Sequence, residues 1–129
     1  MDERKQAMEE RVAAVRQQME QAARQAGREP KDILLLAASK TQDAQTVALS
    51  AGLDIDLFGE NRVQELVEKQ EAGAYGTKPV HMIGHLQKNK VKHTVGRAAL
   101  IHSVDSLELA REISRIAQKK ELVQDILIE

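Results

Sequence analysis

Hydrophobic residues along the chain follow two alternating patterns. At the start, apolar side chains recur every three or four residues from Met8 to Ala26, which is the period of an amphipathic helix. Gly27 and Pro30 are typical of a helix end. The next apolar run, Ile33–Ser39, is continuous, and a short run of this kind favours a strand buried on both faces, as in a parallel sheet.

The same alternation continues to the end of the sequence. The pattern predicts helices over 2–26, 42–51, 60–71, 87–97 and 107–120, and strands over 33–39, 55–59, 80–84, 100–104 and 123–128. Strands that alternate with helices indicate a parallel sheet with right-handed crossovers. Five strands fit two architectures: an open sheet covered by the long first helix, or the first part of a (β/α)8 barrel, which takes ~250 residues.

Two strands of this sheet have no predicted neighbour on one side. The apolar runs 33–38 and 126–128 would then be open edges. Unpaired strand edges are templates for pairing with another chain. We therefore expect the isolated chain to self-associate through these edges.

Composition narrows the class of protein. The length of 129 residues fits one domain, 1–129, and the absence of cysteine removes disulfides and thiolate metal sites. A net charge of −1, with Phe58 and Tyr75 as the aromatic residues, argues against a nucleic-acid partner. No apolar run approaches the ~20 residues of a membrane span, and the charged start lacks a signal segment, so we expect a cytoplasmic protein.

Candidate chemistry lies where the first two strands end. Lys40 directly follows the first strand, and functional side chains gather at the carboxyl ends of parallel strands. A lysine there could attack a carbonyl carbon, or could be a solvated strand-end residue. Asn61, after the second strand, could hydrogen-bond a ligand or belong to a simple turn. Glu60 would favour the positive end of the next helix.

Two other groups of residues carry weaker signals. His81 and His85 have a spacing that binds zinc on a helix, but this segment is predicted to be a strand and lacks the glutamate of an HExxH motif. We therefore predict no metal site. The basic stretch from His85 to Arg97 could meet phosphate or nucleic acid, although without aromatic residues it is more typical of a solvated face.

Four motifs in order make a more specific pattern than any single residue. They are LAASKT at 36–41, FGENRVQE at 58–65, HMIGHLQKNK at 81–90 and IHSVDS at 101–106. Together they closely resemble the pyridoxal phosphate homeostasis protein family, also called YggS or PROSC. The resemblance covers essentially the whole chain, including the predicted first helix.

The resemblance implies a fold and a cofactor. The fold would be a partial (β/α)8 TIM barrel like the N-terminal domain of alanine racemase, with about five parallel strands. The cofactor would be pyridoxal 5′-phosphate (PLP), bound covalently by Lys40, with Asn61, Ile83 and His81 as its neighbours. The function would be intracellular PLP homeostasis without established enzymatic turnover. The alternative is a racemase-like enzyme using Lys40, which would need a second base from another domain.

The resemblance also has limits. The family continues for roughly another hundred residues of barrel, which carry its phosphate-binding loops. We therefore expect this chain to be the N-terminal portion of such a protein and to bind PLP weakly or undetectably. Two residues depart from the family pattern: Met82 stands where an aromatic is usual, and Asp43 where proline is common.

Overall fold

The computed structural model describes residues 3–129. Within them, five parallel strands form one sheet in the order β1-β2-β3-β4-β5. The strands are β1 (Leu36–Ala38), β2 (Leu57–Glu60), β3 (Val80–Met82), β4 (Leu100–Val104) and β5 (Asp125–Ile128). The predicted parallel α/β sheet is therefore confirmed, and spatial neighbours follow chain order as in a barrel.

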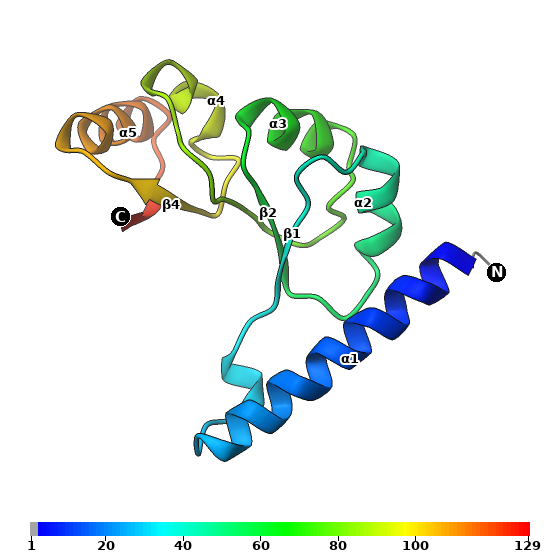
Figure 1. Ribbon diagram of the computed structural model, residues 1–129. Coiled ribbons are helices and arrows are strands. Elements are labelled where there is room, and N and C mark those ends of the chain that lie inside the picture. The colour runs from blue at the N-terminus through cyan, green and yellow to red at the C-terminus, as the bar shows by residue number, and fades with distance from the viewer. Residues whose placement is uncertain (1–2) are drawn as a thin grey trace.

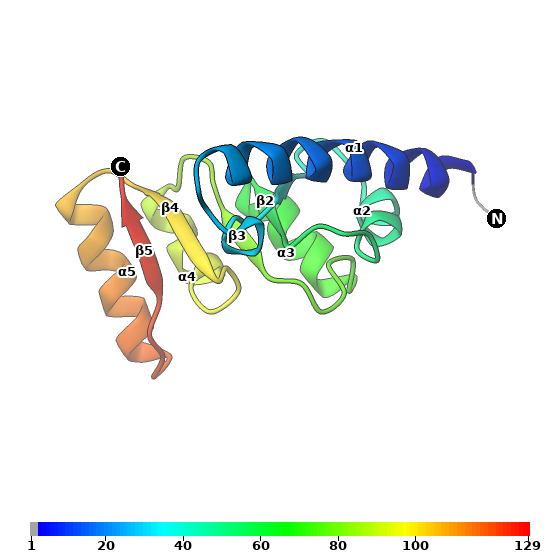
Figure 2. The ribbon, with the colours of Figure 1, turned by 90° about the horizontal axis from the view of Figure 1, so that it is seen from below.

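Helices lie along one side and across one end of this sheet (Figures 1 and 2). They are α1 (Glu3–Gln25), α2 (Ala44–Ser50), α3 (Val63–Glu71), α4 (Val91–Thr94) and α5 (Leu107–Lys119), with short 3-10 turns at Pro30–Asp32 and Lys88–Lys90. Figures 1 and 2 show α2 to α5 following one another along one side of the sheet, while α1 crosses near the end where the strands begin. Arg16 of α1 fixes this crossing through a 2.9 Å ion pair with Asp56, just before β2. The helix thus lies at the amino end of the strands, instead of covering an open sheet as one predicted architecture required.

The hydrophobic core lies between the sheet and its outer helices. Because side chains alternate across a strand, every second strand residue faces this layer. The largest buried apolar side chains come from both sides of it: Phe58, Leu66, Met82, Leu86 and Ile101. Met82, one of the two departures from the family pattern, is completely buried there. Asp43, the other departure, accepts a 2.7 Å hydrogen bond from the Thr46 amide and caps α2.

Several predicted boundaries are wrong. The first strand begins at Leu36, because Ile33 is hydrogen-bonded to Pro30 in a 3-10 turn and Leu34 is 63% exposed. The strand is also not buried on both faces, because β1 is at the edge of the sheet and its residues range from half-buried to exposed. The helix predicted over 87–97 is a 3-10 turn followed by the short α4, which ends before Gly96 at φ +89°.

The predicted end of the first helix is confirmed. The first helix ends before Gly27, which has a left-handed φ of +71°. Ser106 caps α5 by accepting a hydrogen bond from the Leu109 amide. Asp2, the predicted first helical residue, lies outside the described residues. Among the helices of residues 3–129, none combines the length and the hydrophobicity that a membrane span requires.

Candidate functional site at the carboxyl ends of the strands

The first three strands end at one edge of the sheet, and three of the four predicted site residues lie just beyond those ends. Ala38 pairs with Gly59, and Gly59 pairs with His81, so the strand ends are in register. Lys40 follows β1, Asn61 follows β2 and Ile83 follows β3. We call the edge formed by Lys40, Asn61 and Ile83 the rim.

Lys40 lies in a tight turn at this rim and is exposed. The turn closes through a 3.2 Å hydrogen bond from the Gln42 amide to the Ser39 carbonyl. Thr41 has a left-handed φ of +66°, which is strained for a β-branched residue. Its amide donates a 3.0 Å hydrogen bond to Glu65 of α3. The turn that carries Lys40 is therefore attached to the neighbouring helix.

A buried polar cluster lies beside this turn. We define the Glu60 cluster as Ser39, Glu60, Lys69 and Tyr75. Glu60 is fully buried and accepts hydrogen bonds from the Ser39 hydroxyl and, at 2.7 Å, from the Tyr75 hydroxyl. The Lys69 ammonium is 3.1 Å from both Glu60 oxygens and 2.8 Å from the Ser39 carbonyl. The buried charges are therefore paired and hydrogen-bonded.

Tyr75 remains a hydrogen-bond donor in this cluster. Burial raises the pKa of Tyr75 well above its usual range, and the hydrogen bond to Glu60 raises it further. The ring of Tyr75 also packs against Phe58, with ring centres 5.2 Å apart. The phenol thus joins the hydrophobic core to the polar cluster.

Two glycines keep the rim compact. A Cβ atom on Gly84 would lie 2.4 Å from the carbonyl oxygen of Asn61, so the loop after β3 packs directly against the Asn61 backbone. A Cβ atom on Gly59 would lie 2.7 Å from Leu36 and 2.9 Å from Ile83. Ile83 therefore occupies the space above Gly59, on the face of the sheet away from the outer helices.

His81, the fourth predicted site residue, lies in the middle of β3, before the rim. Its side chain contacts that of His102 on β4. The two rings share a hydrogen bond of 2.9 Å between Nδ1 of His81 and Nε2 of His102. Burial lowers the pKa of His81, and His102 lowers it further. His85 is exposed and lies 4.0 Å from Asp105 instead. In the described part of the chain, no three His, Asp or Glu side chains are grouped as a metal site.

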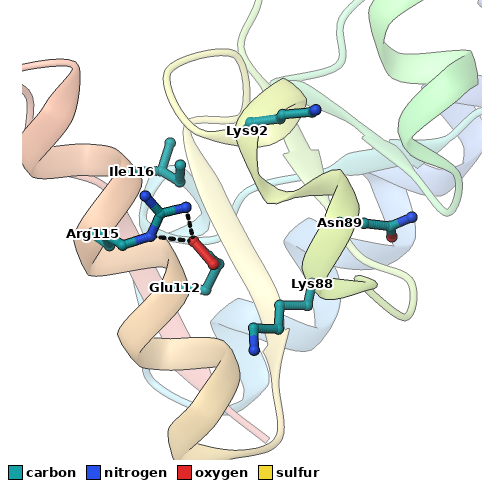
Figure 3. A pocket seen from close by; sticks show the side chains of 6 residues that line it. All are labelled: Lys88, Asn89, Lys92, Glu112, Arg115 and Ile116. Atoms are coloured by element: carbon teal, nitrogen blue, oxygen red, sulfur yellow. Dashed lines mark hydrogen bonds and ion pairs between the residues drawn. The ribbon is translucent and has the colours of Figure 1, made fainter.

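Lys88, Asn89 and Lys92 of the basic stretch line one side of a cleft of about 400 Å³, opposite α5. The cleft is lined by Lys88, Asn89, Lys92, Glu112, Arg115 and Ile116. Figure 3 shows Arg115 turned toward Glu112, 2.7 Å away, while Lys88 and Lys92 extend in different directions. Lys88 is ion-paired with Glu108 at 2.6 Å. Much of this positive charge is therefore already neutralised by acidic neighbours.

The sequence interpretation missed the Glu60 cluster. Glu60 was expected at the start of a helix, but it ends β2, and α3 begins at Val63. A signal was present in Lys69, which stands four residues after Glu65 with Leu66 and Val67 between them. Tyr75 is the only tyrosine in the chain, yet its partner could not be read from local spacing.

The sequence of the chain is similar to those of known proteins. The sequence profile of the alanine racemase N-terminal domain matches residues 5–129. The pyridoxal phosphate homeostasis protein of Aquifex aeolicus is 42% identical over 120 residues, covering 93% of this chain and 53% of that protein. The corresponding protein of Escherichia coli K12 is 38% identical over 107 residues, covering 80% and 45%.

Two solved structures are also similar to the chain, in fold as well as in sequence. The crystal structure of an unknown protein from Bifidobacterium adolescentis has a TM-score of 0.88 at 33% identity, covering 98% of this chain and 56% of that chain. The structure of PipY from Synechococcus elongatus PCC7942 with PLP bound has a TM-score of 0.70 at 33% identity, covering 84% and 51%.

These matches establish the class of protein. The chain belongs to the alanine racemase N-terminal domain family, whose barrel-like fold of parallel strands and helices it shares. Within that family it groups with the pyridoxal phosphate homeostasis proteins, as its four motifs indicated. It spans about half the length of the curated relatives that it matches.

Proposed function

We propose that the chain is the N-terminal portion of a pyridoxal phosphate homeostasis protein and carries Lys40, the residue that bonds the cofactor. The observation that carries this proposal is the position of Lys40, exposed in an anchored turn at the same rim as Asn61 and Ile83. The relatedness to proteins of that name and to PipY with PLP bound supports it. A cytoplasmic location remains a prediction.

The side chains at the rim fit the chemical groups of PLP. A lysine amine suits the aldehyde, an amide suits a polar ring substituent, and an isoleucine suits the face of the ring. When bound, the cofactor supplies an aldehyde carbon. The Lys40 amine would hold the cofactor through that carbon, in a bond that hydrolysis can reverse.

Borohydride trapping tests this assignment. The purified chain is incubated with PLP, the C=N bond is reduced to C–N with borohydride, and modified lysines are located by peptide mass spectrometry. We expect Lys40 to be modified in preference to other exposed lysines, and the signal to vanish in Lys40→Ala but persist in the control Lys31→Ala. Modification spread evenly over the exposed lysines would refute the proposal.

Affinity and turnover require separate measurements. We expect the purified chain to bind PLP weakly and to show no visible cofactor absorbance, because it spans about half the length of its relatives. The alternative function is a racemase-like enzyme with Lys40 as base. It would be detected by incubating the chain with PLP and an L-amino acid and assaying the D-isomer. We expect none, because racemisation needs a second base on the opposite face of the substrate.

A further inference from the structure

Ser39, the residue on the amino side of Lys40, is fixed at two backbone atoms and its side-chain hydroxyl. The amide of Ser39 donates to the Gly59 carbonyl at 3.0 Å, its hydroxyl donates to Glu60, and its carbonyl accepts a 2.8 Å hydrogen bond from Lys69. Of these three hydrogen bonds, only the one donated by the Ser39 amide continues the pairing between strands. The other two bonds come from the Glu60 cluster, so a polar group inside the helix layer fixes the residue next to Lys40.

The backbone on the carboxyl side of Lys40 is held in a strained conformation. Thr41 carries a β-branched side chain at φ +66°, which persists only where the surroundings impose it. The bond that imposes it here joins the Thr41 amide to Glu65 of α3 at 3.0 Å. Lys40 is therefore the single residue between two anchored positions.

One side chain connects both anchors. The Lys69 ammonium contacts the Ser39 carbonyl and Glu60 on one side of the turn, and lies 3.5 Å from Glu65 on the other. Its side chain is 4% exposed, so water competes little for these bonds. Displacing Lys69 would loosen Ser39 and Glu65 together.

We infer that Lys69 and Glu60 are positioning residues that hold the Lys40 turn at the rim. The inference rests on the proposed function, because it assigns the turn to presenting the Lys40 amine to an aldehyde. Neither residue touches the rim's ligand space through its own charged group, since both face the helix layer and are buried. They act through the backbone of Ser39 and Thr41.

The competing explanation is that Glu60 and Lys69 only stabilise the fold. A double variant distinguishes this role from the positioning role. Replacing a buried ion pair by groups of similar shape is often neutral for stability. Glu60→Gln with Lys69→Met should therefore fold, since Gln can still accept from Ser39 and Tyr75. The Ser39 carbonyl would lose the ammonium, and the link between the two anchors would be lost. The matched control, Glu68→Gln with Lys119→Met, makes the same chemical changes at exposed positions.

The first readout is the ratio of borohydride-trapped PLP at Lys40 to that at the exposed Lys31. We expect this ratio to fall about tenfold in the double variant, within the ~10²-fold that misplacing a reacting group can cost. The control should keep the wild-type ratio. An unchanged ratio in a folded double variant overturns the positioning role but leaves the proposed function standing.

The second readout is hydrogen exchange of the Thr41 amide without PLP, which depends only on the anchored turn. We expect it to be protected in the wild type and the control, and to exchange faster in the double variant. If the wild type shows no preference for Lys40, the proposed function fails while this measurement still decides whether the turn is held.

If the double variant does not fold, Ser39→Ala replaces it. This substitution removes the hydroxyl that donates to Glu60 and should lower the Lys40 ratio partially; an unchanged ratio would overturn the inference.

Discussion

Substituting Gly84 by alanine should disrupt the rim directly. The added Cβ would lie 2.4, 2.7 and 2.9 Å from the carbonyl oxygen, Cα and carbonyl carbon of Asn61. All three are backbone atoms, so the clash cannot be relieved by turning a side chain. The chain after β2 and the chain after β3 must move apart, and such overpacking costs about 1–3 kcal/mol.

Substituting a second glycine, Gly52, by alanine is a matched control for the loss of unfolding free energy expected in Gly84→Ala. A Cβ atom on Gly52 would have the Lys5 amine, 4.0 Å away, as its nearest contact, and neither Gly52 nor Gly84 has a left-handed φ. Alanine at Gly52 should therefore be neutral or stabilise by about 0.4–1 kcal/mol, because it restricts the unfolded chain. The two substitutions differ only in the space around the new methyl group.

Urea unfolding followed by far-UV circular dichroism measures both effects. The midpoint should fall for Gly84→Ala and stay equal or rise for Gly52→Ala, with similar slopes. A loss of 1–3 kcal/mol corresponds to roughly 3–15 °C in a thermal melt of a domain this size. If Gly84→Ala unfolds at the same urea concentration as Gly52→Ala, the close approach of Gly84 to Asn61 is refuted.

Three further predictions address the cluster, the histidine pair and the strand edges. Glu60→Ala should lower the free energy of unfolding in urea by about 3–5 kcal/mol, because it leaves Lys69 buried without its carboxylate, and a loss below 1 kcal/mol would contradict the pairing. The pKa of His81 is lowered in the folded chain, so the unfolded chain binds more protons as the pH falls through 6.5. Stability should therefore be fully present above that pH and decrease below it, and urea midpoints should show a smaller decrease in His81→Gln. The open edges of β1 and β5 should make the isolated chain self-associate, which light scattering at rising concentration would detect; a monomer throughout would refute it.

The sequence predicted most of the architecture because its signals are local. Apolar strands and amphipathic helices alternate in order along the chain, and each predicted carboxyl end of a strand lies within two residues of the observed one. Lys40 and Asn61 could therefore be placed at one rim from the strand pattern, whereas Ile83 was named through the motif resemblance. The motif resemblance then selected a barrel-like fold over an open sheet.

The remaining features depend on contacts between distant residues. The burial of Glu60 becomes understandable only when Lys69 and Tyr75 are folded over it, nine and fifteen residues further along the chain. A glutamate before a helical stretch otherwise suits the helix start, which is why it was misassigned. Leu34 shows the opposite error. The apolar run around it predicted a buried strand residue, but Leu34 lies before β1 and is exposed.

Tyr75 determines how the protein absorbs near-ultraviolet light. The chain has one tyrosine and no tryptophan, so near-ultraviolet absorption is dominated by a single phenol, with a small contribution from Phe58. That phenol is bonded to the carboxylate beneath the Lys40 turn. Any loosening of this region therefore changes the ultraviolet signal of Tyr75, so an unlabelled sample reports on the order of the cluster beneath the Lys40 turn.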